Sequence, residues 1–292
     1  MKLKRAAADI KLSHTVFALP FALLSMVMAA CWAHRLPTVV EGLLILVCMV
    51  LARTMAMAVN RWADASLDAL NPRTAGRAIP SGDLSQRFMG GLAWSSGGLF
   101  IAATSGFYFV YANPWPWILS PMVVIYLAGY SFTKRFTSLC HLYLGLALAL
   151  SPLAAAIAIE PGYLSQAPVW WLVLLVTTWV AGFDILYALQ DVAVDREHRL
   201  FSLPSRLGTA RALWISRGLH GTVLGALLAL NLANPQLGIA FALASVATAA
   251  LLAWEHVLVW NSQTHHLHLA FFTLNGLISL LLGAAGIVDL WT

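Results

Sequence analysis

Acidic residues are scarce in this chain: there are 12 among 292 residues, and charged residues of both signs together make up 10%. Hydrophobic residues make up 60%, and apolar runs long enough to cross a lipid bilayer recur along the whole length. This composition excludes an ordinary water-soluble protein. It predicts an integral membrane protein without a separate soluble domain.

Cysteine is also rare. The three cysteines, Cys31, Cys48 and Cys140, stand apart with no CxxC pair, which excludes a disulfide framework. We expect them to be small residues of the membrane core. A signal peptide is not expected, because the first apolar run continues into a polytopic pattern and lacks a small-residue cleavage site.

The apolar runs predict nine membrane spans. Their approximate bounds are 15–33, 38–59, 88–111, 115–133, 138–159, 168–190, 212–231, 236–255 and 269–290. The predicted fold class is therefore all-α: one polytopic domain over residues 1–292, built as a bundle of about nine transmembrane helices around a central cavity that opens to the cytoplasm. Glycine and alanine inside the spans are expected to let the helices pack closely.

The basic residues predict the orientation of the chain. Of the 17 Lys and Arg residues, 15 precede the first span or follow an even-numbered span, whereas Arg35 lies on the opposite side and Arg53 lies inside the second span. Because cytoplasmic loops are enriched in Lys and Arg, we expect the N-terminus to face the cytoplasm from the inner membrane. Membrane topology then explains the net charge of +5, so a nucleic-acid partner is not expected, and no obligatory protein partner is evident. Glu160 and Asp289 fall on the far side, where we expect them to be solvated.

Half of the acidic residues fall in two short polar segments. The first segment, residues 60–82, contains Asp64 and Asp68, and the second, residues 183–206, contains four more acids. Helical spacing of about 100° per residue places several of their side chains on two stripes, one made of Asn60, Asp64 and Asp68 and the other of Asp184, Asp191 and Asp195. Arg53 continues the first stripe into the membrane, and Tyr187 lies beside the second. If the stripes face each other, five carboxylates and one amide converge at the cytoplasmic mouth of a cavity.

Carboxylates brought together in a low-dielectric site repel one another, and divalent cations remove that repulsion. Mg²⁺ prefers oxygen ligands and is commonly held by one or two carboxylates together with substrate phosphates. Four basic residues are predicted on the same side and are suited to bind phosphate oxygens: Arg73, Arg77, Lys134 and Arg135. This combination indicates a magnesium–diphosphate site. Any single one of these charges is equally typical of a solvated helix end, but the repeated spacing in so acid-poor a chain favours a site.

These residues resemble the signatures of the UbiA superfamily of membrane prenyltransferases. Asn60, Asp64 and Asp68 match the NDxxDxxxD signature, and the segment NPRTAGRAIPSG follows it as in the family. The second signature, DxxYAxxDxxxD, is met by residues 184–195, and YSFTKRFT at 130–137 is also similar. One departure is Arg61, which stands where many members carry a second acid.

The resemblance implies a polyprenyltransferase of ubiquinone or menaquinone biosynthesis. Its substrates would be a polyprenyl diphosphate and a small aromatic acid, either 4-hydroxybenzoate or a dihydroxynaphthoate, and its cofactor would be Mg²⁺. By this analogy the metal ligands are Asp64, Asp68, Asp184, Asp191 and Asp195. The diphosphate-binding residues are Asn60, Arg73, Arg77, Lys134 and Arg135. The isoprenoid chain would lie among apolar helices, in contact with membrane lipid.

Two further residues are candidates for the chemistry. Arg53 is a basic residue inside the second predicted span, and a charge buried in a membrane marks a functional site by default, so we expect it to bind the acceptor's carboxylate. A structural Arg paired with a nearby acid is the alternative. Tyr187 is expected to orient a substrate or to stabilise a carbocation with its ring face, although an ordinary packed tyrosine fits the pattern equally well. With Asp64 and Asp191, these two residues form the predicted catalytic set.

Other functions stay open at this point. The acceptor of a UbiA-type enzyme is in some cases haem, a chlorophyll precursor or a glycerol lipid. A phosphotransferase for alcohols is disfavoured because the DGxxAR motif is absent. A transporter also keeps acids in the membrane, but its charges are more typically near the bilayer midplane on broken helices, whereas these lie at helix ends.

Overall fold

The computed structural model describes residues 2–10, 17–261 and 269–292, and these residues are helical without β-strands. Nine long helices among them coincide with the nine predicted spans. They are α2 (Leu19–Trp32), α3 (Val39–Ala63), α5 (Gln86–Tyr111), α6 (Trp115–Thr133), α7 (Cys140–Ile159), α8 (Ala167–Ala188), α11 (Thr209–Ala233), α12 (Ile239–Asn261) and α13 (Asn275–Trp291). Residues 15 and 16, which we predicted to begin the first span, lie outside the described residues. By length and composition, seven candidate membrane spans are present in the described part of the chain, and α2 is a shorter apolar helix.

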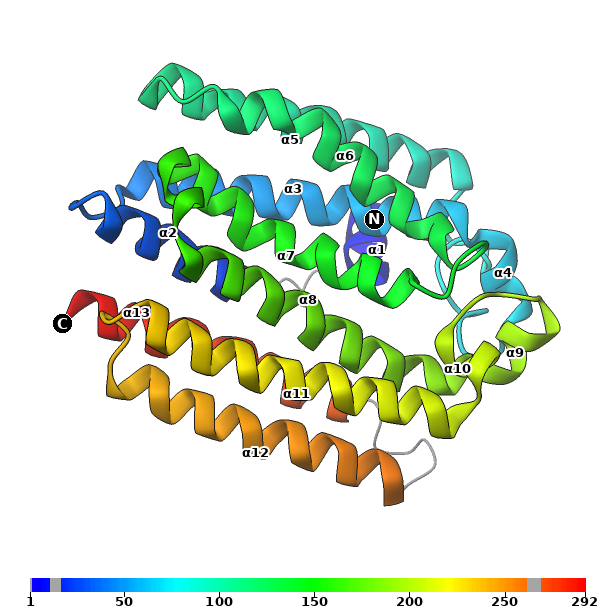
Figure 1. Cartoon of the computed structure of the whole chain (residues 1–292). Helices are drawn as coiled ribbons and strands as arrows, with labels where there is room; N and C mark the ends of the chain where they lie inside the picture. The colour runs from blue at the N-terminus through cyan, green and yellow to red at the C-terminus, as the bar shows by residue number, and fades with distance from the viewer. Residues whose placement is uncertain (1, 11–16, 262–268) are drawn as a thin grey trace.

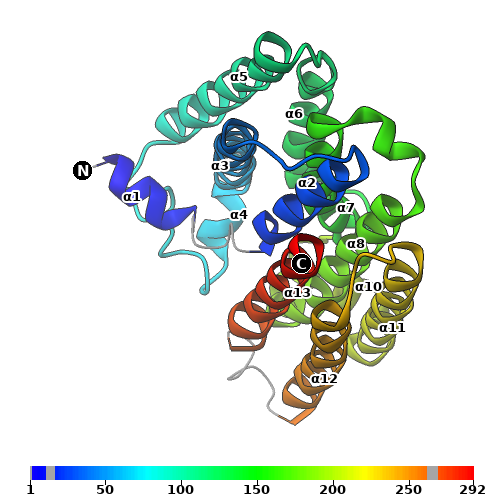
Figure 2. The same ribbon diagram turned by 90° about the vertical axis from the view of Figure 1, so that its left-hand side faces the viewer.

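The long helices run side by side and form one bundle (Figure 1). Three short helices gather at one end of it: α4 (Ala65–Leu70), α9 (Val192–Glu197) and α10 (Leu203–Leu207). Both polar segments lie at this end, which we call the motif end. The N-terminal helix α1 (Lys2–Asp9) lies across the bundle direction at its periphery, beside α3 and α4 (Figure 2).

Local sequence signals explain where the helices that carry the site begin. The Thr38 hydroxyl accepts the Glu41 N–H while the Glu41 carboxylate accepts the Thr38 N–H, so that a capping box starts α3. Ser85 caps α5 through the N–H of Phe88. α11 follows Gly208, whose φ of 81° suits a residue without a side chain.

Close contacts between the helices depend on small residues, as we predicted. A Cβ atom added at Gly145 of α7 would lie 2.1 Å from the carbonyl oxygen of Thr177 on α8. A Cβ atom at Gly182 of α8 would lie 2.3 Å from the His220 ring on α11. Glycine therefore lets α7 and α11 approach α8 closely, and α8 carries the start of the second signature.

One prediction is wrong at the end of the bundle opposite the motif end. We expected Asp289 to be solvated, but its carboxylate accepts the N–H groups of Gly238, Ala240 and Phe241 at 2.7–3.2 Å. Ala240 and Phe241 belong to the first turn of α12, where backbone N–H groups have no partner within the helix, and Gly238 directly precedes that turn. Asp289 of α13 therefore caps α12 and ties the two helices together.

Candidate active site

A polar cavity of about 150 Å³ lies at the motif end of the bundle. Both polar segments contribute acids to it: Asp64 and Asp68 from the first, and Asp191 and Asp195 from the second. Other polar residues in its wall are Asn60, Asn71, Arg73, Thr74, Arg77, Tyr130 and Lys134. Segments more than 100 residues apart in the sequence therefore meet around one hollow, as the predicted facing stripes require.

The acids do not continue on regular helices as we predicted. α3 ends at Ala63, Asp64 is its C-terminal cap residue, and Asp68 lies on the separate helix α4. α8 ends at Ala188, Asp191 closes a single 3₁₀ turn, and Asp195 lies on α9. These breaks turn Asp191 and Asp195 away from the line of α8, and Asp184 is the one predicted acid that does not line the polar cavity.

Asp64 is the most enclosed acid in the cavity wall, with 2% of its surface exposed. Its carboxylate contacts Lys134 at 3.1 Å and Arg135 at 3.2 Å, and it accepts the Asn60 amide N–H at 3.1 Å. Arg135 also donates to the Ala63 carbonyl at 2.6 Å, which satisfies an open acceptor at the end of α3. The loop after α6 thus supplies both cations that neutralise Asp64.

Arginines hold two other acids in bidentate or chelating contacts. One nitrogen of Arg77 donates to both carboxylate oxygens of Asp68, at 2.7 and 2.8 Å. Arg73 donates to Asp191 from two nitrogens, at 3.0 and 2.6 Å, and the Asn71 amide adds a third bond at 2.9 Å. The Arg73–Asp191 contact joins the two polar segments directly.

The second polar segment is held in place by residues that the sequence analysis did not select. The Ser202 hydroxyl donates to Asp195 at 2.5 Å. His141 Nε2 accepts the Leu203 N–H at 3.2 Å, so the ring proton lies on Nδ1 and is donated to Asp184 at 2.7 Å. The start of α10 therefore positions both Asp184 and Asp195. The only sequence signal for His141 is its place just after the YSFTKRFT segment.

The donor set of the polar cavity fits magnesium. Four carboxylates and the Asn60 carbonyl supply only oxygen, which is what Mg²⁺ prefers. In the described part of the chain, no three acidic, histidine or cysteine side chains form a ready-made metal group, because each cavity acid already contacts a base or a hydroxyl. Asp64, Asp68, Asp191 and Asp195 would hold the ion only by exchanging some of those contacts.

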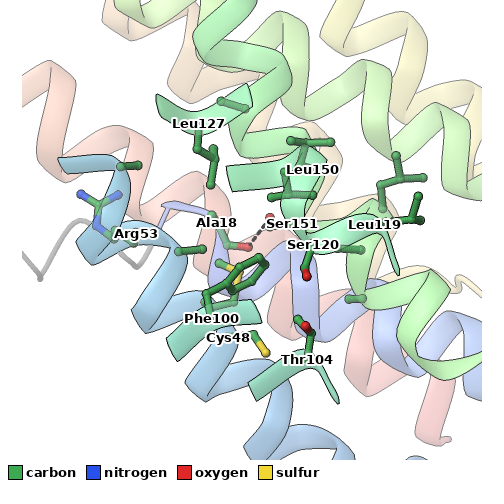
Figure 3. Close-up of a pocket in the computed structure, with 18 of the residues that line it drawn as sticks. Ala18, Cys48, Arg53, Phe100, Thr104, Leu119, Ser120, Leu127, Leu150 and Ser151 are labelled. Carbon is green, nitrogen blue, oxygen red and sulfur yellow. Dashed lines mark hydrogen bonds between the residues drawn. The ribbon is translucent and has the colours of Figure 1, made fainter. Parts of the chain in front are cut away.

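A larger, apolar cavity of about 260 Å³ lies between α3, α5, α6 and α7. Arg53 of α3 is the one charged side chain among the described residues that line it. In Figure 3, Arg53 lies on one side of this cavity, and Ser120 and Thr104 lie across it beyond Phe100. Alanine, leucine and methionine side chains make up most of the remaining wall.

Tyr130 lines both cavities, so the polar and the apolar cavity adjoin at this residue of α6. Its segment resembles the family in sequence, but no sequence signal predicted a role for Tyr130 itself. Tyr187, which we predicted to orient a substrate or to stabilise a carbocation, receives a hydrogen bond from Arg73 at 3.1 Å, and the Arg73 guanidinium lies 5.3 Å from its ring centre. The ring face of Tyr187 is thus already next to a cation.

Comparisons with known proteins agree with this architecture. A sequence model of the UbiA prenyltransferase family matches residues 18–277. A 4-hydroxybenzoate octaprenyltransferase of Pseudomonas aeruginosa (strain UCBPP-PA14) is 30% identical over 231 residues, which cover 79% of this chain and 74% of that protein. The relative from Pseudomonas fluorescens (strain SBW25), which carries the same name, is 29% identical and is matched over 75% and 71% of the two chains.

Solved structures match over nearly the whole chain. The apo structure of a UbiA homologue from Aeropyrum pernix K1 is 30% identical, with a TM-score of 0.84 over 95% of this chain and 98% of that one. A UbiA homologue from Archaeoglobus fulgidus, solved with DMAPP and Mg²⁺, is 18% identical with a TM-score of 0.75 over the full length of both chains, and it shares the fold. The helical bundle and the matched residues 18–277 place this chain in the UbiA prenyltransferase family.

Proposed function

We propose that this chain is a magnesium-dependent polyprenyltransferase that moves a polyprenyl group from its diphosphate to an aromatic acid, 4-hydroxybenzoate or a dihydroxynaphthoate. The product would enter ubiquinone or menaquinone biosynthesis. We place the protein in the inner membrane as one polytopic unit, with the N-terminus and the polar cavity facing the cytoplasm. Its partners would be these two substrates and the surrounding lipid.

One observation carries the proposal: an acid- and base-lined cavity adjoins an apolar cavity at Tyr130. A polyprenyl diphosphate has a charged head and a hydrocarbon tail, and the two cavities match these two parts. The names of the Pseudomonas relatives and the ligands of the Archaeoglobus homologue support the same substrate class.

The residues of the polar cavity would bind and neutralise the diphosphate. Bound Mg²⁺ would supply Lewis-acid stabilisation of the departing diphosphate. Arg73, Arg77, Lys134 and Arg135, now paired with acids, would bind phosphate oxygens once metal ions occupied those acids.

The chemistry then follows from the geometry of the two cavities. The allylic C–O bond breaks, the diphosphate leaves with the bonding electrons, a ring carbon of the acceptor attacks the prenyl carbon, and the ring loses one proton. The apolar wall excludes water, which would otherwise capture the cation. Tyr130, at the boundary between the cavities, is placed to face the reacting carbon with its ring.

Arg53 favours an anionic acceptor. Arg53 lies in the wall of the apolar cavity, and a guanidinium is suited to a bidentate contact with a substrate carboxylate. A transporter is disfavoured because the acids lie at the end of the bundle beside basic loops and not at its centre. An acceptor without an acid group could not make this contact with Arg53.

An assay on membranes that contain the full chain tests the proposal. Labelled polyprenyl diphosphate and Mg²⁺ are supplied with 4-hydroxybenzoate in one sample and a dihydroxynaphthoate in the other. Product should form with one acceptor and disappear with EDTA and in Asp64→Ala or Asp191→Ala. Asp83→Ala is the matched control, because Asp83 is an acid in the loop just after the first segment and does not line the polar cavity.

The outcomes separate the parts of the proposal. Product from one acceptor identifies the reaction and the pathway. Release of diphosphate without either product would keep the diphosphate site and discard both acceptors. If folded protein released no diphosphate at all, and instead moved cations across liposomes, the prenyltransferase proposal would be wrong.

A further inference from the structure

Arg61 is a buried cation beside the polar cavity, with 5% of its surface exposed. It occupies the position at which the first family signature has an acid. Its Nη1 atom donates to the side-chain oxygen Oδ1 of Asn60 at 2.8 Å, while the side-chain nitrogen Nδ2 of Asn60 donates to Asp64 at 3.1 Å. Asp64, Asp68 and Arg77 also lie within electrostatic range of its guanidinium. Arg61 therefore adds a positive charge where Mg²⁺ would bind and positions Asn60 at the same time.

Asp9, the last residue of α1, supplies the opposite charge. Its carboxylate lies 3.4 Å from Arg61 Nε, and both side chains are almost fully buried, with 7% and 5% exposed. Arg61 Nη2 also donates to the Asp9 carbonyl oxygen at 3.2 Å, and the Asp9 carboxylate accepts the Ala78 N–H at 3.1 Å. Asp9 thus bridges α3 and the loop that follows α4.

The remainder of α1 fixes Asp9 in this place. Ala6 and Ile10 are buried and pack in the same apolar cluster as Met55, Ala58 and Val59 of α3. An exposed second link joins Arg5 to Asp83 at 2.5 Å. Figure 2 shows α1 at the edge of the bundle, beside α3 and α4.

We propose that Asp9 is a charge-compensating residue of the magnesium site, which offsets Arg61 and replaces, from α1, the acid that position 61 lacks. This inference rests on the proposed function, because it assumes that the cavity acids bind Mg²⁺. The contacts Asp9–Arg61, Arg61–Asn60 and Asn60–Asp64 would link the negative charge of Asp9 to Asp64, the most enclosed acid of the polar cavity. The N-terminal helix is then part of the active site.

The test measures Mg²⁺ binding through thermal unfolding of the full chain in detergent, with the metal alone as the probe. Asp9→Asn removes the charge and keeps the shape of the side chain. We expect the Mg²⁺ concentration that gives half of the stabilisation to rise about tenfold, as expected for one unbalanced, partly screened charge near the metal. Arg5→Gln is the matched control, because it breaks the exposed link of the same helix and leaves Asp9 in place.

A double variant separates charge compensation from simple docking of α1. In Asp9→Asn/Arg61→Gln the unbalanced charge is gone, so the Mg²⁺ requirement should return to within about threefold of wild type. If Asp9 only anchored α1, the double variant would stay as impaired as Asp9→Asn. Should Asp9→Asn not fold, Arg61→Gln alone tests the idea, because removing the cation should lower the Mg²⁺ requirement below that of wild type.

The results also distinguish this inference from the proposed function. Wild-type protein that is stabilised by Mg²⁺, together with an Asp9→Asn variant that needs the same concentration, would overturn the role of Asp9 and leave the magnesium site intact. If Arg5→Gln raised the required Mg²⁺ concentration as much as Asp9→Asn does, the role of Asp9 would be overturned as well. Wild-type protein without any response to Mg²⁺ would contradict the magnesium site itself, and this inference with it.

Discussion

We expect Mg²⁺ to displace arginines from the acids of the polar cavity, and Arg77 allows a direct test. In the metal-free protein, its guanidinium chelates Asp68, an acid with 6% of its surface exposed. Arg77→Met keeps the apolar stem of the side chain and removes the charge, so Asp68 is left buried and unbalanced. Magnesium should then bind the free carboxylate more tightly, because it no longer competes with an arginine.

The expected size of the effect follows from burial. Breaking a fully buried ion pair costs about 3–5 kcal/mol. The Arg77 side chain is 24% exposed, so water replaces part of the contact, and we expect a loss of about 2 kcal/mol in EDTA. This corresponds to a fall in Tm of about 5 °C. With Mg²⁺ at saturation the difference should shrink below about 1 kcal/mol, because a tenfold gain in Mg²⁺ affinity contributes about 1.4 kcal/mol.

The assay is thermal unfolding of detergent-solubilised protein, followed through its 12 tryptophans, in EDTA and over a Mg²⁺ titration. Arg87→Met is the control, since Arg87 is an exposed base at the start of α5. In the activity assay, Arg77→Met should raise the KM for the prenyl diphosphate, because one phosphate-binding cation is missing. A Tm loss of the same size in EDTA and in saturating Mg²⁺ would refute the exchange of arginine for metal.

Three other predictions concern the apolar cavity and the bundle. Arg53→Leu should raise the KM for the aromatic acid about tenfold or more and leave the KM for the prenyl diphosphate nearly unchanged, with Arg53→Lys intermediate; an equal rise in both constants would argue against acceptor binding. Asp289→Ala should lower the stability by about 1–2 kcal/mol, because three N–H groups of α12 lose their cap, and an unchanged Tm would mean that water replaces the cap without loss. Gly145→Ala should cost about 1–3 kcal/mol by pushing α7 from the Thr177 carbonyl of α8, whereas Gly91→Ala, with open space at its Cβ position, should be neutral in the same Tm measurement or slightly stabilising.

Much of the fold could be predicted because a membrane span depends on the local sequence. An apolar run of sufficient length forms a helix wherever it lies in the chain, since the bilayer leaves backbone groups no other partner. All nine predicted spans therefore have a counterpart among the described helices. The two polar segments could also be selected, because acids are so rare elsewhere in the chain.

Predictions at the helix ends were less accurate, because regular spacing cannot show where a helix breaks. The interruptions at Asp64 and at residues 189–191 change the direction of every acid that follows. Asp184 precedes the second break and stays on α8, where it contacts His141 and does not line the polar cavity.

The spacing of residues along the sequence also could not predict contacts between distant segments. Asp289 caps a helix that begins 50 residues earlier in the sequence, at Ile239. Asp9 meets Arg61 because α1 packs across α3. Neither partner could be identified without tertiary structure: Asp289 had been predicted to be solvated, and no role had been predicted for Asp9.

The contact between Arg73 and Asp191 has a consequence for how the protein is assembled in a cell. The two residues are 118 positions apart, and four long helices, α5 to α8, begin between the two polar segments. During synthesis the first segment emerges long before the second. The contact between Arg73 and Asp191 can therefore form only after α8 has entered the membrane. In chains that stop before α8, Arg73 would lack Asp191, and the set of charges at the motif end would be incomplete.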